Sequence, residues 1–256
     1  MGKGIVKKLT EEYGLFLIVS LLLISLWEWV ITKGWIPSFI LPSPSAIWIA
    51  LVEHRELLLR DHLPATLKVV LIGFSISLIG GLMLGVGMHF SHRLEKVLYP
   101  FLVISQTIPL IALSPIFIMW FGYTIWSKVA VTILITFFPI VVSTYDGLKA
   151  GGNEYRELLL TMGASRWTIF KLVQVPMALP SIFSGLKMAV VYSVVGATIG
   201  EWLGASEGLG YFSRRMSGNL QADAVFAAIF LLSLLGIALF ICISLIEKQL
   251  LKNNPR

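Results

Sequence analysis

Residues 153–176 read NEYRELLLTMGASRWTIFKLVQVP and lie between two long apolar runs, at 127–145 and 180–202. Two acidic and three basic side chains occur in this segment, whereas the flanking runs are almost free of charge. Each apolar run has about the 20 residues that cross the hydrocarbon of a bilayer as an α-helix. The segment is therefore predicted to be a polar loop that joins two membrane-spanning helices.

The spacing within this loop predicts two short helices joined at a glycine. Glu154 and Glu157 lie in the first turn of the first helix, where the helix dipole favours negative charge, and Gly163 supplies the left-handed residue that ends it. Ser165 can cap a second helix, which is expected to end at the prolines that begin with Pro176. Two short helices at a fixed angle form a projecting surface that suits a docking partner.

The first helix of the loop has one apolar face. Tyr155, Leu158, Leu159 and Met162 recur at positions i, i+3, i+4 and i+7. Such a face in a polar loop is expected to contact a partner protein. The alternative is a helix that lies on the bilayer surface.

Composition indicates a membrane protein independently of the loop. Hydrophobic residues make up 57% of the chain and charged residues 13%, which leaves too little polar surface to coat a soluble globule. Apolar runs of sufficient length occur at 14–31, 64–88, 98–121, 127–145, 180–202 and 224–246. The prediction is an all-α polytopic membrane protein with about six transmembrane helices, and residues 1–256 are expected to form a single domain.

Basic residues predict the orientation in the membrane. With six spans both termini lie on one side, which holds twelve Lys and Arg residues against about seven on the other. Because cytoplasmic loops are enriched in Lys and Arg, both termini and the loop at 153–176 are expected to face the cytoplasm. The net charge of +6 is interpreted as this topological bias. No nucleic-acid partner is expected, because the Lys and Arg residues are dispersed along the chain.

The run at 98–121 is predicted to be a broken helix. Pro100, Pro109 and Pro115 each remove a backbone donor, and the freed carbonyls need partners in neighbouring helices or in a water-filled cavity. The polar residues around these breaks are candidates for lining a translocation pathway: Ser105, Gln106, Thr107 and Ser114. The alternative is that they hydrogen-bond between packed helices.

Two residues at the outer end of the run at 180–202 are also candidates for function. Glu201 and Trp202 are predicted to contribute to an outer gate or to a landing surface for a soluble receptor. The alternative is an ordinary solvated loop.

The predicted spans contain no histidine that could act in catalysis, and the chain has no ATP-binding motif. His54, His62, His89 and His92 fall in or at the edges of predicted loops, so no buried imidazole is expected as a base or metal ligand. The chain also lacks the Gly-x4-Gly-Lys-Ser/Thr phosphate loop. We expect a protein that is not an enzyme, holds no cofactor or metal, and receives energy from a partner.

The loop at 153–176 resembles a known family motif. The pattern Glu-x5-Gly-x9-Val-x-Val-Pro is similar to the EAA loop of membrane subunits from binding-protein-dependent ATP-binding cassette (ABC) importers, and it is carried by Glu157, Gly163, Val173, Val175 and Pro176. Where the family usually has two alanines, this chain has Leu158 and Leu159.

The resemblance extends over most of the chain. Leu41-Pro42-Ser43-Pro44, Ile108-Pro109, Trp120-Phe121-Gly122 and Gly208-Leu209-Gly210 are similar to the nitrate, sulfonate, taurine and thiamine-precursor branch of the family. Within this branch, the chain is more similar to permeases for pyrimidine precursors of thiamine than to those for taurine or sulfonates.

The resemblance implies an importer permease in a bacterial inner membrane. A cytoplasmic ATPase is expected to dock on the loop, through Glu154, Glu157, Leu158, Gly163, Ala164, Ser165 and Pro176. A soluble solute-binding protein is expected to deliver the substrate on the outer side. Two copies of the permease are expected to pair as a homodimer within the lipid.

A channel or ion-coupled carrier that works without ATP is the alternative function. Such proteins are expected to carry coupling acids or bases within their spans. The candidates in this chain, Glu28, Asp146 and Glu201, fall near the ends of predicted spans.

Overall fold

The computed structural model describes residues 2–150 and 153–252, with side chains other than those of 2–13, 153, 154 and 156. All regular structure in these residues is helical. The elements are α1 (Gly2–Thr32), α2 (Pro44–Glu53), α3 (Arg55–Leu57), the π-helical turn η1 (Leu58–His62), α4 (Leu63–Phe90), α5 (His92–Ser105), α6 (Leu110–Phe121), α7 (Ile125–Ala150), α8 (Asn153–Thr161), α9 (Arg166–Ile169), the π-helical turn η2 (Phe170–Gln174), α10 (Val175–Gly204), α11 (Leu209–Gly218) and α12 (Ala222–Lys252).

The prediction of an all-α protein with about six spans is confirmed. Five helical stretches of the described chain are long and apolar enough to cross a membrane: Gly14–Thr32, Arg55–Phe90, Ile125–Ala150, Arg166–Gly204 and Ala222–Lys252. Counted as one broken span, the pair α5 and α6 makes the number six; their axes differ by 102° across a short break. The break occurs at residues 106–109, so the predicted interruption of this span is also confirmed.

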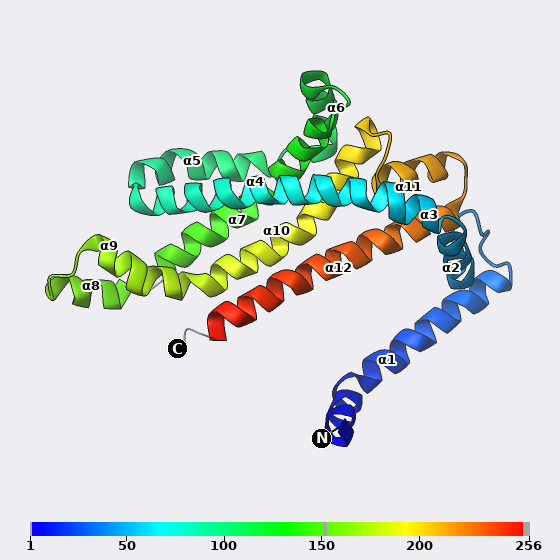
Figure 1. Ribbon diagram of the computed structural model, residues 1–256, viewed down its shortest axis with the longest axis horizontal. Coiled ribbons are helices and arrows are strands. Elements are labelled where there is room, and N and C mark those ends of the chain that lie inside the picture. Colours follow the sequence, from blue (N-terminus) through cyan, green and yellow to red (C-terminus); the bar gives the residue numbers. More distant parts are fainter. Residues whose placement is uncertain (1, 151–152, 253–256) are drawn as a thin grey trace.

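The core forms around α7, which packs between α4 and α10 (Figure 1). Helix α12 packs on α10 and α11, whereas α1 extends away from the other helices and meets α2 near its end. There the Glu28 carboxylate accepts hydrogen bonds from the backbone N–H (3.0 Å) and the hydroxyl (2.7 Å) of Ser45. Most of Gly14–Thr32 is exposed, as expected for a helix surrounded by lipid or by a partner.

Glycines allow α4 to approach α7 closely. A Cβ atom at Gly81 would lie 2.8 Å from Cγ2 of Ile140, and one at Gly85 would lie 2.7 Å from Cβ of Thr144. Small residues at such positions bring two backbones together, and van der Waals packing then stabilises the pair within lipid.

We expect Gly85→Ala to destabilise the folded chain by about 1–3 kcal/mol, because the added methyl group forces α4 and α7 apart. Gly87→Ala is the matched control, since its Cβ would meet only Leu94 Cδ1 at 3.9 Å and alanine favours a helix. Thermal unfolding in mild detergent measures the difference. Equal midpoints for the two variants would show that this contact is not tight.

Each π-helical turn lies just before a proline. In η2, Val175 N–H donates to Phe170 O, so Pro176 occupies the first turn of α10, where a missing donor is tolerated. The same arrangement occurs in η1, where Leu63 N–H donates to Leu58 O ahead of the proline at position 64.

The prediction that the second loop helix ends at Pro176 is therefore wrong. The helix α9 continues through η2 into α10, and together they form one stretch of 39 residues, Arg166–Gly204. Along the longest dimension of the molecule, α8 and α9 lie at one end and α2, α3 and α11 at the opposite end (Figure 1). The single long helix thus connects the loop at 153–176 with the region of α11.

Candidate functional site

The turn between α8 and α9 has the predicted left-handed glycine. Gly163 has φ +81°, its N–H donates to Leu160 O (3.0 Å), and the N–H of Ala164 donates to Leu159 O (3.0 Å). These two bonds form a Schellman motif, which satisfies carbonyls at the end of α8. Ser165 then caps α9, because its hydroxyl accepts a hydrogen bond from Thr168 N–H at 3.1 Å.

The apolar face of α8 is exposed to solvent. Tyr155, Leu158 and Met162 show 58%, 58% and 73% of their surfaces, and Glu157 beside them is also exposed. Such a row of large apolar side chains indicates an interaction surface rather than core packing. The side chain of Glu154, also predicted to belong to this surface, lies outside the described residues, and Pro176 is partly buried at the start of α10.

The four candidate pathway residues do not form one group. Gln106 and Thr107 are exposed at the break between α5 and α6, and the Thr107 hydroxyl donates to Ile104 O at 2.8 Å. Ser105 is partly buried and donates to Leu102 O at 2.7 Å. Ser114 lies on α6 and is only 2% exposed, so it packs inside the helix bundle.

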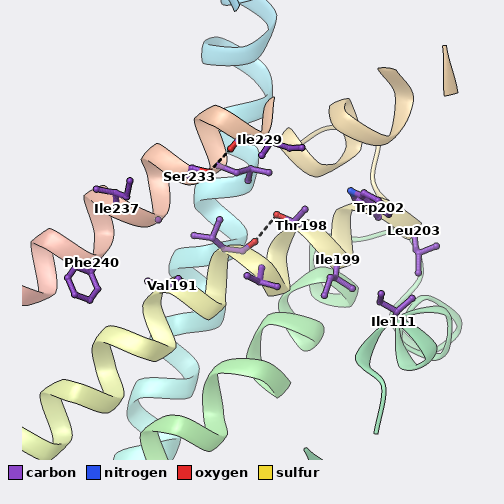
Figure 2. A pocket seen from close by; sticks show the side chains of 14 residues that line it. Ile111, Val191, Thr198, Ile199, Trp202, Leu203, Ile229, Ser233, Ile237 and Phe240 are labelled. Atoms are coloured by element: carbon purple, nitrogen blue, oxygen red, sulfur yellow. Dashed lines mark hydrogen bonds between the residues drawn. The ribbon is translucent and has the colours of Figure 1, made fainter. Parts of the chain in front are cut away.

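An apolar pocket of about 620 Å³ lies between α6, α10 and α12 (Figure 2). Ile111 of α6 and Trp202 of α10 lie at one end, and Phe240 of α12 lies toward the other. The hydroxyls of Thr198 and Ser233 donate to carbonyls of their own helices. The sequence did not reveal this pocket, because apolar residues that line a cavity have the same spacing as those that face lipid.

Three buried side chains hold the beginning of α11. The consecutive backbone N–H groups of residues 208–210 donate to His62 Nδ1 (3.0 Å), Thr66 Oγ1 (2.8 Å) and Glu201 Oε2 (2.8 Å). We call His62, Thr66 and Glu201 the capping triad. The Thr66 hydroxyl also donates to Glu201 Oε2 at 3.1 Å. Gly208 has φ +116°, and a Cβ there would lie 2.6 Å from Glu201 Oε1, so glycine is required.

The capping triad corrects two expectations. His62 is 5% exposed and lies within the continuous helix Arg55–Phe90, so the prediction that all histidines lie in or beside loops is wrong. The reason is that this helix begins nine residues before the apolar run at 64–88, through α3 and η1. Glu201 is 1% exposed, so a solvated loop is wrong for this residue, whereas Trp202 is 47% exposed.

A scan against family models matches residues 77–252 to binding-protein-dependent transport system inner membrane components. This chain belongs to that family. The permease is also 51% identical over 231 residues to the formylaminopyrimidine transport permease protein ThiX of Halalkalibacterium halodurans, which covers 90% of this chain and 92% of ThiX. It is 35% identical to the riboflavin transport system permease protein RibX of Chloroflexus aurantiacus, over 92% of this chain and 88% of RibX.

A solved structure of the MetNI methionine ABC transporter in inward-facing conformations shares the fold of the permease. The TM-score is 0.66 at 19% identity, over 77% of this chain and 97% of that chain. The family resemblance inferred from the sequence, including its branch, is confirmed.

The permease is therefore the multi-pass inner-membrane subunit of an ABC importer and is not an enzyme. A binding-protein-dependent system of this kind includes an ATPase and a solute-binding protein as partners. The family membership decides against a channel or carrier that works without ATP.

Proposed function

We propose that the ATPase docks on the projecting end formed by α8 and α9, and that the helix Arg166–Gly204 carries its movement to the outer side of the membrane. The observation that carries this proposal is the continuity of that helix over 39 residues. It begins just after the Gly163 turn, and its last turn contains Glu201, which holds the first turn of α11. Movement of the docking end as a rigid body would therefore reach the outer end directly.

The docking surface consists of the exposed face of α8 and the turn that follows it. Leu158 supplies an apolar contact, Glu157 a charge, and Gly163, Ala164 and Ser165 a turn whose shape is set by internal hydrogen bonds. An interface with a small apolar centre and a polar rim has this composition. Glu154 and Pro176 complete the proposed surface at its two ends.

The proposed orientation places both termini and the docking surface in the cytoplasm. The twelve basic residues predicted for that side support it. In this orientation the capping triad and Trp202 lie at the outer end of the permease. We propose that Trp202 forms the outer gate, since it lies at one end of the apolar pocket, and that Glu201 positions it from the adjacent buried site.

The proposed pathway lies between two copies of the permease. Gln106 and Thr107 at the break of the third span supply exposed polar groups, and Ser105 lies beside them. Non-helical backbone at membrane depth is tolerated where it lines a water-filled cavity or is covered by protein. Pairing of two permeases provides such a setting for the break, and Ser114 is assigned to the packing behind it.

The proposed substrate is a small aminopyrimidine. The support is the 51% identity to a permease named for formylaminopyrimidine transport, against 35% for one named for riboflavin. A planar heterocycle of this kind presents both an aromatic face and polar edges. Trp202 and Phe240 at the two ends of the apolar pocket offer aromatic contacts.

Purification from native membranes in mild detergent, with mass spectrometry of the co-purifying proteins, tests this function. We expect to recover an ABC ATPase, a solute-binding protein and two copies of the permease per complex. The ligand released from the solute-binding protein should be an aminopyrimidine. Recovery of the permease alone would refute the proposed assembly. A solute-binding protein loaded with a sulfonate or a flavin would refute only the proposed substrate class.

A further inference from the structure

A second pocket, of about 270 Å³, lies at the docking end of the permease, where several spans meet. It is lined by residues from the end of α4, the start of α5, the end of α7 and the α9–η2 segment. Phe90 is the last residue of one span, Lys149 is next to the last of another, and Arg166 is the first of a third. Phe90 and Lys149 lie two and four residues beyond the apolar runs at 64–88 and 127–145, so this wall of the pocket lies just outside the hydrocarbon.

The floor of this pocket is built from buried residues. Tyr145, Ile169 and Gln174 are 4%, 2% and 6% exposed. The Nε2–H of His89 donates to Gln174 Oε1 at 3.0 Å, which ties the end of α4 to η2. The pocket is therefore a fixed feature of the fold and includes part of the helix that leads to the docking loop.

The rim of the pocket favours an anion. Among the described residues that line it, Glu95 is the one acid, and both of its carboxylate oxygens are already paired, with His92 Nδ1 at 2.7 Å and with Lys149 Nζ at 3.0 Å. Arg166 is exposed and forms no ion pair with the side chains that the structure describes. An exposed guanidinium that lines the same pocket as a paired carboxylate is suited to bind phosphate oxygens.

Two exposed aromatic side chains, Phe90 and Trp167, continue from the pocket along the surface, and both pack on the buried Phe170. The ring of Phe90 lies 4.8 Å from that of Phe170, and Trp167 stacks on Phe170 at 5.3 Å between centroids. The Lys171 ammonium lies 5.2 Å from the centroid of Trp167. Aromatic and basic residues grouped in this way are typical of the membrane interface, where acyl chains meet headgroups.

We propose that this pocket binds the phosphate of an anionic phospholipid, with Arg166 as its main contact and the acyl chains along the exposed rings of Phe90 and Trp167. Such a lipid would bridge α9 to the ends of α4 and α7. The lipid would then stabilise the angle at which the docking loop meets the membrane domain. This role is separate from contact with the ATPase, which is proposed for the exposed face of α8 and the Gly163 turn.

Native mass spectrometry of the full-length permease with added dioleoylphosphatidylglycerol tests the proposal. We expect Arg166→Gln to weaken binding about tenfold, the equivalent of one charge-assisted hydrogen bond. Arg166→Lys should restore part of the affinity because the charge returns without the planar fork. Arg93→Gln is the matched control, since Arg93 is exposed on the same side of the permease but does not line the pocket.

Three results would overturn the proposal. Equal losses for Arg166→Gln and Arg93→Gln would mean that surface charge alone attracts the lipid. Titration with inorganic phosphate separates the two sources of phosphate oxygens, and equal affinity for the free ion with the same Arg166 dependence would assign the pocket to a soluble phosphate compound. Unchanged lipid binding in Arg166→Gln, with reduced recovery of the ATPase, would assign the pocket to a carboxylate of that partner.

Discussion

Gly163→Asp should abolish recovery of the ATPase with the permease while the permease still inserts and folds. Position 163 has φ +81° and open space around it, and aspartate adopts this left-handed region more readily than most residues. The backbone of the turn is therefore expected to persist. The added carboxylate would be buried without a partner in the docked complex, which costs about 3 kcal/mol or more. This corresponds to on the order of a hundredfold loss of affinity.

The matched control for this prediction is Gly34→Asp. Gly34 also has a positive φ, +75°, and a Cβ there would meet no atom within 4 Å. It lies two residues after the end of α1, outside the docking loop. Affinity purification of each variant with quantification of the ATPase measures the effect, and thermal unfolding of the isolated permease checks its fold. Normal ATPase recovery with Gly163→Asp would refute docking at this turn.

Glu201→Ala should destabilise the permease by about 3–5 kcal/mol and abolish transport. The carboxylate accepts from Gly210 N–H and from the Thr66 hydroxyl, and all three groups are buried. Each buried donor that loses its acceptor costs about 1–3 kcal/mol. The cavity left by the side chain adds a further cost. We expect the first turn of α11 to detach, because Gly208 has no side chain to replace the lost cap.

Glu201→Gln separates the hydrogen bonds from the charge. The amide carbonyl can still accept from Gly210 N–H, so we expect less than half of the destabilisation of Glu201→Ala. Glu207→Ala is the surface control, since Glu207 is exposed, and it should change stability by no more than about 0.5 kcal/mol. Thermal unfolding and substrate uptake are measured for all three. Wild-type stability of Glu201→Ala would contradict the role assigned to the capping triad.

Local patterns predicted the turn between α8 and α9 accurately. The left-handed Gly163 and the cap at Ser165 depend on backbone geometry that only a few residue types provide, so their identity is informative. The break in the third span followed from Pro109, which directly precedes α6. The second loop helix was mispredicted because Pro176 is compatible with a helix when a π-helical turn precedes it.

Contacts between distant segments were not predictable in this way. His62 and Glu201 meet through the α11 start, and their separation of more than 130 residues has no local signature. Gly208-Leu209-Gly210 was one of the segments that carried the family resemblance, and the structure shows why the first glycine is needed. The apolar pocket beside Trp202 could not be predicted for a different reason, since lipid-facing and cavity-facing side chains are chemically alike.

Site-directed photocrosslinking tests most directly whether the two ends of the permease face different partners. Leu158→Cys at the docking end and Leu220→Cys beyond α11 are compared in a Cys242→Ser background, since both leucines are exposed and Cys242 is the native thiol. Each thiol is labelled with benzophenone maleimide in the assembled importer, and crosslinked proteins are identified by mass spectrometry. We predict capture of the ATPase from position 158 and of the solute-binding protein from position 220. Capture of the ATPase from position 220, or its absence at position 158, would contradict the account.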